Sequence, residues 1–191
     1  MKWMIASDIH GSAKYCRLLV QRYDEERAER LLLLGDVLYH GPRNDLPEEY
    51  DPKAVIRMLN ERAEEILCVR GNCEAEVDQM VLDFPVLADY ALLPLGKHVV
   101  YVTHGHVMNE GHLPPMKQGD ILLHGHTHVP ACVRHETYVY MNPGSVSIPK
   151  EGSPRGYMIL EEMEGPVFCW KKLDTGEEYM ERYSLHDIPK Q

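Results

Sequence analysis

Three short apolar runs in the first part of the chain alternate with helix-forming segments, and this order constrains the fold most. The runs are KWMIAS (2–7), LLLLGD (31–36) and ILCVRGN (66–72). Residues 12–30 have apolar side chains at helical spacing behind Ser12, a good N-cap, and residues 51–65 begin with Asp51 and Pro52, which favour a helix start. A strand–helix–strand–helix–strand order predicts parallel strands joined by right-handed crossovers.

The second half of the chain shows little helical pattern and is rich in short strands separated by turn residues. The expected strands are residues 98–105, 120–126, 131–135, 137–144, 156–162 and 166–173. An α/β first half followed by a strand-rich second half predicts two packed sheets flanked by helices. A length of 191 residues suits one core, so we expect residues 1–191 to form a single domain.

The charge balance disfavours nucleic acid as a partner. The chain has 30 acidic and 20 basic residues, a formal net charge of −10, whereas nucleic-acid affinity rests mainly on Lys and Arg. A short basic run such as Lys171-Lys172 is best interpreted as solvated surface. A small anionic substrate remains compatible with this charge if bound cations reverse the local field.

Cysteine usage and hydropathy predict a cytoplasmic protein. The chain has five cysteines, an odd number, and none of them form a C-x-x-C pair. This usage is typical of a protein in a reducing compartment. The N-terminal apolar run is too short for a signal peptide, and no run approaches the ~20 residues of a membrane span. We therefore expect no membrane association.

Each of five expected strands delivers polar side chains at its carboxyl end, the edge where open α/β sheets bind ligands. These side chains are Asp8, His10, Asp36, Asn72, His104, His126 and His128. Carboxylate, amide and imidazole donors together suit divalent ions such as Mn²⁺, Fe²⁺, Zn²⁺ or Ni²⁺. Seven ligands exceed the needs of one ion, and they suffice for two if one carboxylate bridges.

Each of these residues alone has an ordinary structural interpretation. Gly35-Asp36 is compatible with simple turn chemistry, and a lone His near a strand end is usually structural or exposed. The coincidence of five such segments in one chain favours a metal site. His124 alternates with His126 along an extended segment, so we expect it to face away from the site and serve a structural role.

The order D-x-H, G-D, G-N, H-G-H, G-H-x-H resembles the calcineurin-like metallophosphoesterase superfamily. The segments SDIHGS, GDVLYHGPRN, VRGNCEAEVDQM, THGH, GHTHVP and NPGSVSIPK are similar to its branch of small bacterial YfcE-type phosphodiesterases. The resemblance runs from about Met4 to Leu160. It implies a four-layer α/β/β/α sandwich of two mixed sheets flanked by helices. It also places the turn NPGSVSIPK beside the site.

The resemblance further implies a dinuclear metal centre. One ion would be held by Asp8, His10, Asp36 and His128, and the second by Asp36, Asn72, His104 and His126, with Asp36 as the bridge. Mn²⁺ is the expected ion, with Fe, Zn, Ni or Mg as alternatives. The implied activity is a metal-dependent hydrolase, a phosphodiesterase acting on small phosphodiesters by attack of a hydroxide that bridges the two metals.

Cys73 departs from a pattern found in many members of the superfamily, where a histidine follows the G-N asparagine. A neutral thiol is a poor proton donor, which leaves the general acid open, although YfcE-like members are similar in having cysteine there. We expect Cys73 to line the pocket, with simple packing as the alternative. Arg43 is either a contact to the substrate phosphate or a surface cation. His40 is either a proton donor or a packing residue. We expect His106 to orient the metal ligands.

Three other functions are compatible with this resemblance. The fold also occurs in the small scaffold subunit of retromer, so a non-catalytic metal-containing binding module is one alternative; the complete ligand set argues against it. A phosphomonoesterase is modestly disfavoured by Cys73, and a nuclease by the net charge.

Small members of the branch tend to form homo-oligomers. The C-terminal segment 177–191 is expected to be an edge strand or a short tail.

Overall fold

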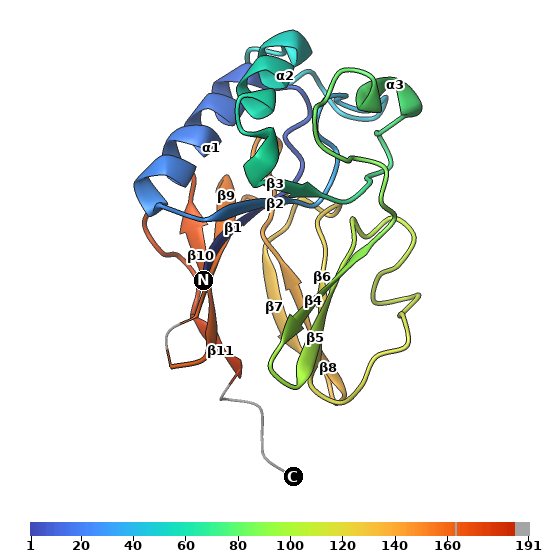
Figure 1. Ribbon diagram of the computed structural model, residues 1–191, viewed down its shortest axis with the longest axis vertical. Helices are drawn as coiled ribbons and strands as arrows, with labels where there is room; N and C mark the ends of the chain where they lie inside the picture. Colours follow the sequence, from blue (N-terminus) through green and yellow to red (C-terminus); the bar gives the residue numbers. More distant parts are fainter. Residues whose placement is uncertain (163, 186–191) are drawn as a thin grey trace.

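The computed structural model describes residues 1–162 and 164–185, and its framework is two β-sheets packed face to face (Figure 1). The first sheet has six strands in the order β11-β10-β9-β1-β2-β3. These are β1 (Lys2–Ala6), β2 (Arg30–Leu33), β3 (Ile66–Cys68), β9 (Gly156–Glu162), β10 (Pro166–Lys172) and β11 (Tyr183–Ser184). The expected parallel β1-β2-β3 unit is confirmed, and β9, β10 and β11 extend it antiparallel.

The second sheet has five strands in the order β4-β5-β6-β8-β7. They are β4 (Ala91–Leu95), β5 (His98–Val102), β6 (Asp120–Leu123), β7 (Ala131–Arg134) and β8 (Tyr138–Asn142). β5, β6 and β8 run parallel to one another, while β4 and β7 close the two edges antiparallel. Both sheets are therefore mixed, and each has a parallel centre whose strands end on one edge.

Two helices cover the outer face of the first sheet. They are α1 (Ala13–Glu26), which Ser12 caps as expected, and α2 (Pro52–Asn60), which Asp51 caps. Leu19 of α1 and Val55 and Leu59 of α2 pack in one buried cluster with Met4 and Leu31 of the sheet. This burial of one face of each helix anchors the loops that follow β1 and β2.

The main core lies between the two sheets. Ile5 and Leu32 from the first sheet and Val100, Ile121 and Met141 from the second are buried together there. Their neighbours along each strand point to the opposite face, as period-two alternation requires. The strands of both sheets are consequently held in one fixed relation, which positions the loops at their carboxyl ends.

The outer face of the second sheet is covered by the loop between β5 and β6. Met116 of this loop packs on Leu122, Tyr138 and Tyr140, and the Tyr101 hydroxyl donates to the carbonyl oxygen of Pro115 at 2.6 Å. The expected fold class is confirmed as two mixed sheets flanked by few helices. Among the described residues, a loop rather than a helix forms the layer outside the second sheet.

Several boundaries differ from the expectations. α1 ends at Glu26 because Arg27 adopts a left-handed conformation with φ of 53°. The second expected helix stops at Asn60, and a 3₁₀ turn (Ala63–Glu65) follows. Helix α3 (Glu76–Gln79) and strand β4 were not predicted. β4 contains a proline, which is tolerated because β4 is an edge strand with one unpaired side.

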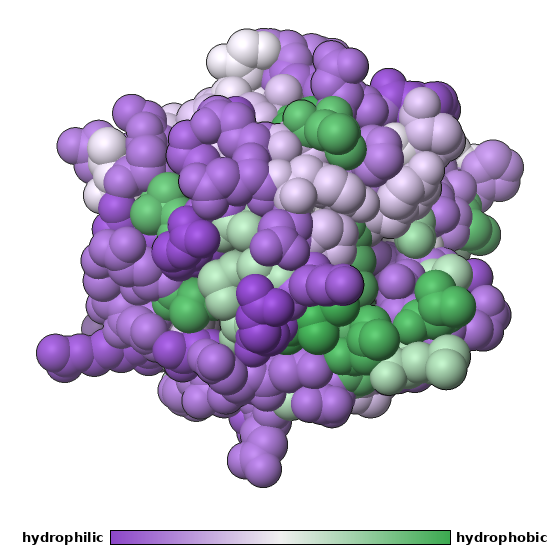
Figure 2. Space-filling view, turned by 90° about the horizontal axis from the view of Figure 1, so that it is seen from above, coloured by the Kyte–Doolittle hydropathy of each residue, from purple (hydrophilic) through white to green (hydrophobic). Residues whose placement is uncertain are grey.

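Of the two forms expected for the C-terminal segment, its described part contains the edge strand, β11, and residues 186–191 lie outside the described residues. Seen from the side of α2 and α3, the surface is mostly hydrophilic with separate apolar patches (Figure 2). The exposed apolar side chains of the molecule include Val77 in α3 and Met80 directly after it.

None of the helices in the described part of the chain has the length and apolarity to cross a membrane.

We predict that Ile121→Ala destabilises the fold by about 2–5 kcal/mol, because Ile121 is fully buried between the sheets and the substitution leaves a cavity. Urea denaturation followed by circular dichroism measures this. Leu92→Ala is the control: Leu92 is 48% exposed on β4, so its replacement should change stability by no more than about 0.5 kcal/mol. Equal effects of the two substitutions would contradict the assigned core.

Candidate metal centre

The seven expected ligands meet where the parallel strands of both sheets end. Asp8 and His10 follow β1, Asp36 follows β2 and Asn72 follows β3. From the second sheet, His104 follows β5, and His126 and His128 follow β6. Because the two sheets pack with these ends on the same side, residues separated by up to 120 positions face one another in one connected cluster.

The first group of donor atoms surrounds the carboxylate of Asp8. Asp8 Oδ1 lies 3.5 Å from His10 Nε2 and 3.3 Å from His128 Nε2, and the two imidazole nitrogens are 3.3 Å apart. Asp36 Oδ2 is 3.7 Å from His10 Nε2. Metal bonds of about 2.0–2.2 Å place neighbouring ligand atoms roughly 3.0–3.6 Å apart, so this spacing suits one divalent ion.

The second group of donor atoms surrounds His104. Its Nε2 lies 3.4 Å from Asp36 Oδ2, 3.2 Å from Asn72 Oδ1 and 3.2 Å from His126 Nδ1. Asp36 Oδ2 therefore belongs to both groups. This is the position that a carboxylate bridging two ions would take, and the division of ligands is the one that the sequence motifs imply.

Backbone carbonyls determine the tautomer of three histidines. The Nδ1–H groups of His10, His104 and His128 donate to the carbonyl oxygens of Tyr39 (2.8 Å), Leu34 (2.7 Å) and Ile148 (2.6 Å). Nε2 of each ring is then left with a lone pair directed into the cluster. Such outer contacts are typical of metal-binding histidines, whose other ring nitrogen is held by a hydrogen bond.

The cluster requires positive charge at its centre. With both Nδ1 atoms donating outwards, the Nε2 lone pairs of His10 and His128 face each other at 3.3 Å. Asp8 Oδ1 is buried beside them, and among the described residues it accepts no hydrogen bond. Lone pairs this close repel unless a proton or a metal ion lies between them. Protons on these rings would also account for their contacts with Asp8 in metal-free protein, and in place of the protons the donors fit a metal ion.

The backbone at the ligands is strained. Asp8, His10, Asp36, His126 and His128 all have positive φ, between 50° and 65°. A non-glycine residue adopts this left-handed conformation at a cost of roughly 1–2 kcal/mol, and such residues cluster at functional sites. The buried strands on either side hold these turns, which aim successive side chains at one point.

Two glycines allow the backbone to approach the carboxylates. A Cβ on Gly125 would lie 1.9 Å from Ser7 Oγ and 2.7 Å from Asp8 Oδ2. A Cβ on Gly71 would lie 2.2 Å from Asp36 Oδ1. The glycine of G-H-x-H and that of G-N are therefore required by close contact with the Asp8 and Asp36 carboxylates.

Glu74 is a functional residue that the sequence reasoning missed. Its buried carboxylate accepts hydrogen bonds from the backbone N–H groups of Asp36 (2.8 Å), Val37 (2.7 Å) and Gly71 (2.5 Å). It thus ties the loop carrying Asp36 to the loop carrying Asn72. Burial, and then the charge of Asp36, raise the pKa of Glu74 to about 7, while the three N–H groups favour the anion.

The NPGSVS segment after β8 supports the first group of ligands. The hydroxyls of Ser145 and Ser147 both donate to the carbonyl oxygen of Asp8, at 2.9 and 3.0 Å. The same segment supplies the Ile148 carbonyl that orients His128. The family resemblance placed this turn beside the site. The contacts themselves could not be read from the sequence, because small polar residues between two strands usually form turns.

Both carboxylates are held as anions. Burial raises the pKa of Asp8, but its contacts with His10 and His128 outweigh that effect, so the pKa lies well below its usual value. Asp36 behaves in the same way, with burial opposed mainly by His104, and its pKa is lowered. The cluster therefore offers two negative charges to bound cations.

Cys73 lies at the edge of the cluster. Its backbone N–H donates to Asp36 Oδ1 at 2.9 Å, and its sulfur lies within 4.8 Å of donor atoms of His10 and Asp36. Burial, and then the Asp36 carboxylate, raise the pKa of the thiol. Cys73 is therefore a neutral thiol whose backbone N–H orients the Asp36 carboxylate.

The other candidate residues fall in different places. Arg43 lines the cavity over the cluster, whereas His40 is not among the lining residues and packs its ring against Tyr39 and Tyr50. His106 is exposed, with its ring centroid 5.4 Å from that of His104. His124 points away from the cluster and stacks on Tyr140, in the structural role expected for it.

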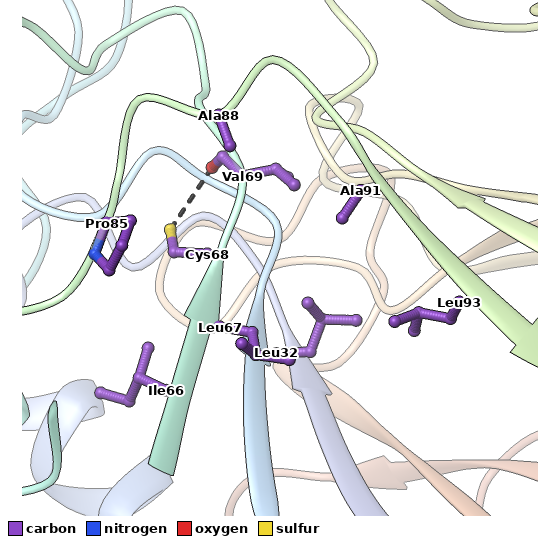
Figure 3. A pocket seen from close by; sticks show the side chains of 9 residues that line it. All are labelled: Leu32, Ile66, Leu67, Cys68, Val69, Pro85, Ala88, Ala91 and Leu93. Carbon is purple, nitrogen blue, oxygen red and sulfur yellow. Dashed lines mark hydrogen bonds between the residues drawn. The ribbon is translucent and has the colours of Figure 1, made fainter. Parts of the chain in front are cut away.

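The cavity over the cluster has a volume of about 460 Å³ and a polar lining. It is lined by Asp36, Arg43, Asn44, Asn72, His126, Thr127, His128 and Lys150. A second cavity, of about 220 Å³, opens between the edge strands β3 and β4 and is lined only by apolar side chains and Cys68 (Figure 3). Its lining offers no charged side chain to an anionic ligand. The first cavity is the candidate substrate site because four of the seven donor residues line it.

We predict that divalent metal stabilises the protein. Adding Mn²⁺ at 100 times its Kd to chelator-treated protein should stabilise it by about 2.7 kcal/mol, raising Tm by roughly 5–10 °C for a chain of this size. Differential scanning calorimetry measures the shift. The Asp36→Ala variant lacks the shared ligand, so Mn²⁺ should raise its Tm much less than that of the wild type. If Mn²⁺ raised the Tm of this variant by the same amount, the metal would not bind at the assigned site.

We predict that Glu74→Gln weakens metal binding although Glu74 is not one of the seven donor residues. A glutamine amide presents N–H groups to N–H donors, which should cost about 1–3 kcal/mol of stability and lower metal affinity about 10–100-fold. Mn²⁺ titration calorimetry measures the affinity. The control is Glu76→Gln at an exposed position two residues away, which should bind Mn²⁺ like the wild type. Unchanged affinity in Glu74→Gln would refute the positioning role.

Comparisons with known proteins identify the family of this chain. Residues 1–165 match the calcineurin-like phosphoesterase superfamily domain. Phosphodiesterase YfcE of Escherichia coli K12 is 47% identical over 161 residues, covering 84% of this chain and 88% of YfcE. The probable metallophosphoesterase YsnB of Bacillus subtilis is 24% identical over 170 residues, covering 84% of this chain and 83% of YsnB.

Solved structures show the same relationship. The structure of YfcE, a phosphoesterase from E. coli, superposes with a TM-score of 0.91 at 42% identity, covering 97% of this chain and all of YfcE. Vps29 from Entamoeba histolytica shares the fold at a TM-score of 0.61 and 20% identity, over 96% of this chain and 99% of that protein. The chain thus belongs to the calcineurin-like phosphoesterase superfamily, as its motifs indicated, and is similar to YfcE.

Proposed function

We propose that this protein is a metal-dependent phosphodiesterase that hydrolyses small phosphodiesters at two divalent ions. The observation that carries the proposal is the pair of donor groups that share Asp36 Oδ2. Its support from relatives is the 47% identity to a protein named as a phosphodiesterase, over most of both chains.

The ligand roles follow the two donor groups. Asp8, His10 and His128 would hold one ion, Asn72, His104 and His126 the other, and Asp36 both. Two ions held there would supply an activated water as nucleophile and positive charge for the phosphoryl oxygens. The chain's own contribution is to fix this geometry: Glu74 and the Cys73 N–H hold Asp36, and backbone carbonyls orient three imidazoles.

The donor set favours borderline-hard ions. It combines carboxylate, amide and imidazole donors, and the one thiol at its edge is kept neutral. Such sites suit Mn²⁺, Fe²⁺, Zn²⁺ and Ni²⁺ more than ions that prefer thiolates. We propose Mn²⁺ as the native ion, with Fe, Zn, Ni or Mg as substitutes.

The proton for the leaving alcohol lacks an evident donor in the chain. Cys73 has a raised pKa and so is a weak acid, and His40 is packed between two tyrosine rings away from the cavity lining. Departure of the alcohol should then depend on its own acidity. This favours diesters with acidic leaving groups over alkyl monoesters.

The complete donor set also distinguishes the proposal from a scaffold function. A binding module needs the fold but gains nothing from strained turns that direct seven donors at one point. We propose the cytoplasm as the location of the protein, because all five cysteines are free thiols.

A nucleic-acid substrate remains disfavoured by the net charge of −10.

We predict that chelator-treated protein supplied with Mn²⁺ hydrolyses bis-p-nitrophenyl phosphate at least tenfold faster than p-nitrophenyl phosphate, measured as kcat/KM from p-nitrophenolate absorbance. Asp36→Ala should lose at least 100-fold, because losing the shared ligand disrupts both donor groups. Across aryl methyl phosphates, log kcat should fall steeply as the pKa of the leaving phenol rises.

Two results would count against the proposal. Full activity in Asp36→Ala would mean that the metal cluster is not the catalytic site. No hydrolysis with any divalent ion, despite metal bound with the expected stoichiometry, would favour a binding module. A flat dependence on leaving-group pKa would leave the diesterase standing and instead indicate a strong general acid.

A further inference from the structure

The cavity over the metal cluster contains two cations that the metal cluster does not use. Arg43 comes from the loop between β2 and α2, and Lys150 from the segment between β8 and β9. Both line the cavity together with Asn44 and Thr127. Lys150 was not among the candidate residues found from the sequence, because nothing in the pattern NPGSVSIPK sets this lysine apart from a surface lysine.

The backbone at both cations is anchored close to the site. The Lys150 N–H donates to the carbonyl oxygen of the metal-ligand candidate His128 at 3.2 Å, and the Lys150 carbonyl accepts from the N–H and hydroxyl of Ser153. Next to Arg43, the Asn44 side chain donates to the His40 carbonyl at 2.8 Å and closes the turn. The two side chains thus start from fixed points beside the cavity.

Neither cation has an acidic partner. In the described ranges, no carboxylate forms an ion pair with Arg43 or Lys150, although Asp and Glu outnumber Lys and Arg by 30 to 20. What sets these two cations apart from other basic side chains is that both line one cavity beside the donor cluster. Electrostatic complementarity at such a cavity favours a negatively charged ligand.

Arg43 and Lys150 lie outside the set of seven donor residues, yet they line the same cavity as Asp36, Asn72, His126 and His128. In the proposed reaction the scissile phosphate would lie at the donor cluster. The two cations are therefore placed to contact a second anionic group of the substrate.

The lining also excludes recognition by apolar contact. Its only rings are the imidazoles of His126 and His128, both assigned to metal, and it has no aliphatic side chain beyond the methyl group of Thr127. An aryl or nucleobase group would find the guanidinium plane of Arg43 and these imidazoles to stack on, but no apolar surface. What the lining offers beyond the metals is charge and hydrogen bonds, from Arg43, Lys150, Asn44 and Thr127.

We propose that Arg43 and Lys150 form an anion subsite, and that the natural substrate is a small phosphodiester carrying a second anionic group on one of its alcohol portions. The second group is a carboxylate or a phosphate, which share the chemistry that Arg and Lys recognise. The proposal rests on the proposed phosphodiesterase function, whose scissile phosphate occupies the metal cluster.

The test is a binding comparison that needs no turnover. Methyl(3-carboxypropyl)phosphinate and its carboxamide, methyl(3-carbamoylpropyl)phosphinate, have no ester bond and differ by one negative charge. Titration calorimetry on the Mn²⁺-loaded protein should show the carboxylate binding at least tenfold more tightly, as expected for charge-assisted contacts. Equal affinity for the two compounds, or no measurable binding of the carboxylate, overturns the proposal.

Substitutions test whether Arg43 and Lys150 contact the second anionic group or only contribute to the net charge of the protein. Lys150→Met and Arg43→Met should each reduce the carboxylate preference at least threefold while leaving affinity for Mn²⁺ and for the amide within twofold. Lys150→Arg should retain the preference. The matched control is Lys97→Met: Lys97 is exposed and precedes β5, at the end of the strand opposite His104, so this variant should behave like the wild type.

Two patterns distinguish failure of this proposal from failure of the proposed function. If both compounds lose affinity equally in Lys150→Met, the lysine contacts the phosphoryl group and the subsite is refuted, while diester hydrolysis stands. If the preference follows Arg43 and Lys150 but bis-p-nitrophenyl phosphate is not hydrolysed with any divalent ion, the subsite stands and the phosphodiesterase proposal fails.

Discussion

The position of the Asp36 carboxylate is the constraint on which the rest of the site depends. Its Oδ2 lies between His10 Nε2 and His104 Nε2, one contributed by each sheet. A shared ligand tolerates little displacement, since movement toward one donor group opens the other. The buried core between the sheets, and Glu74 with its three backbone N–H contacts, keep that displacement small.

Stability and function oppose each other at this edge of the molecule. Five of the seven expected ligands sit in left-handed backbone, and buried imidazole nitrogens face each other with their lone pairs. Neither arrangement would persist in an isolated loop. The strands preceding these turns are among the most buried parts of the chain, so their packing compensates the local cost, and a bound cation would relieve the repulsion.

The charge distribution supports the proposed preference for small anions. The chain is acidic overall, which repels polyanions at long range, yet the candidate substrate cavity is lined by Arg43 and Lys150 beside the proposed metal cluster. On this proposal, small anions would enter where an extended polyanion meets repulsion from the surrounding surface. The cavity between β3 and β4 has an apolar lining without charged side chains, and none of the seven donor residues lines it.

The sequence by itself determined the parallel β1-β2-β3 unit and the donor residues, because apolar runs ending in Asp, Asn or His place those side chains on one sheet edge. Only the tertiary structure decided what lies around them. The contacts of Glu74 and Ser145 with backbone, and the cavity position of Lys150, join segments distant in the chain. Sequence periodicity reports which face of its own element a residue occupies. It carries no information on which distant backbone group that residue meets, because that depends on how the two sheets pack.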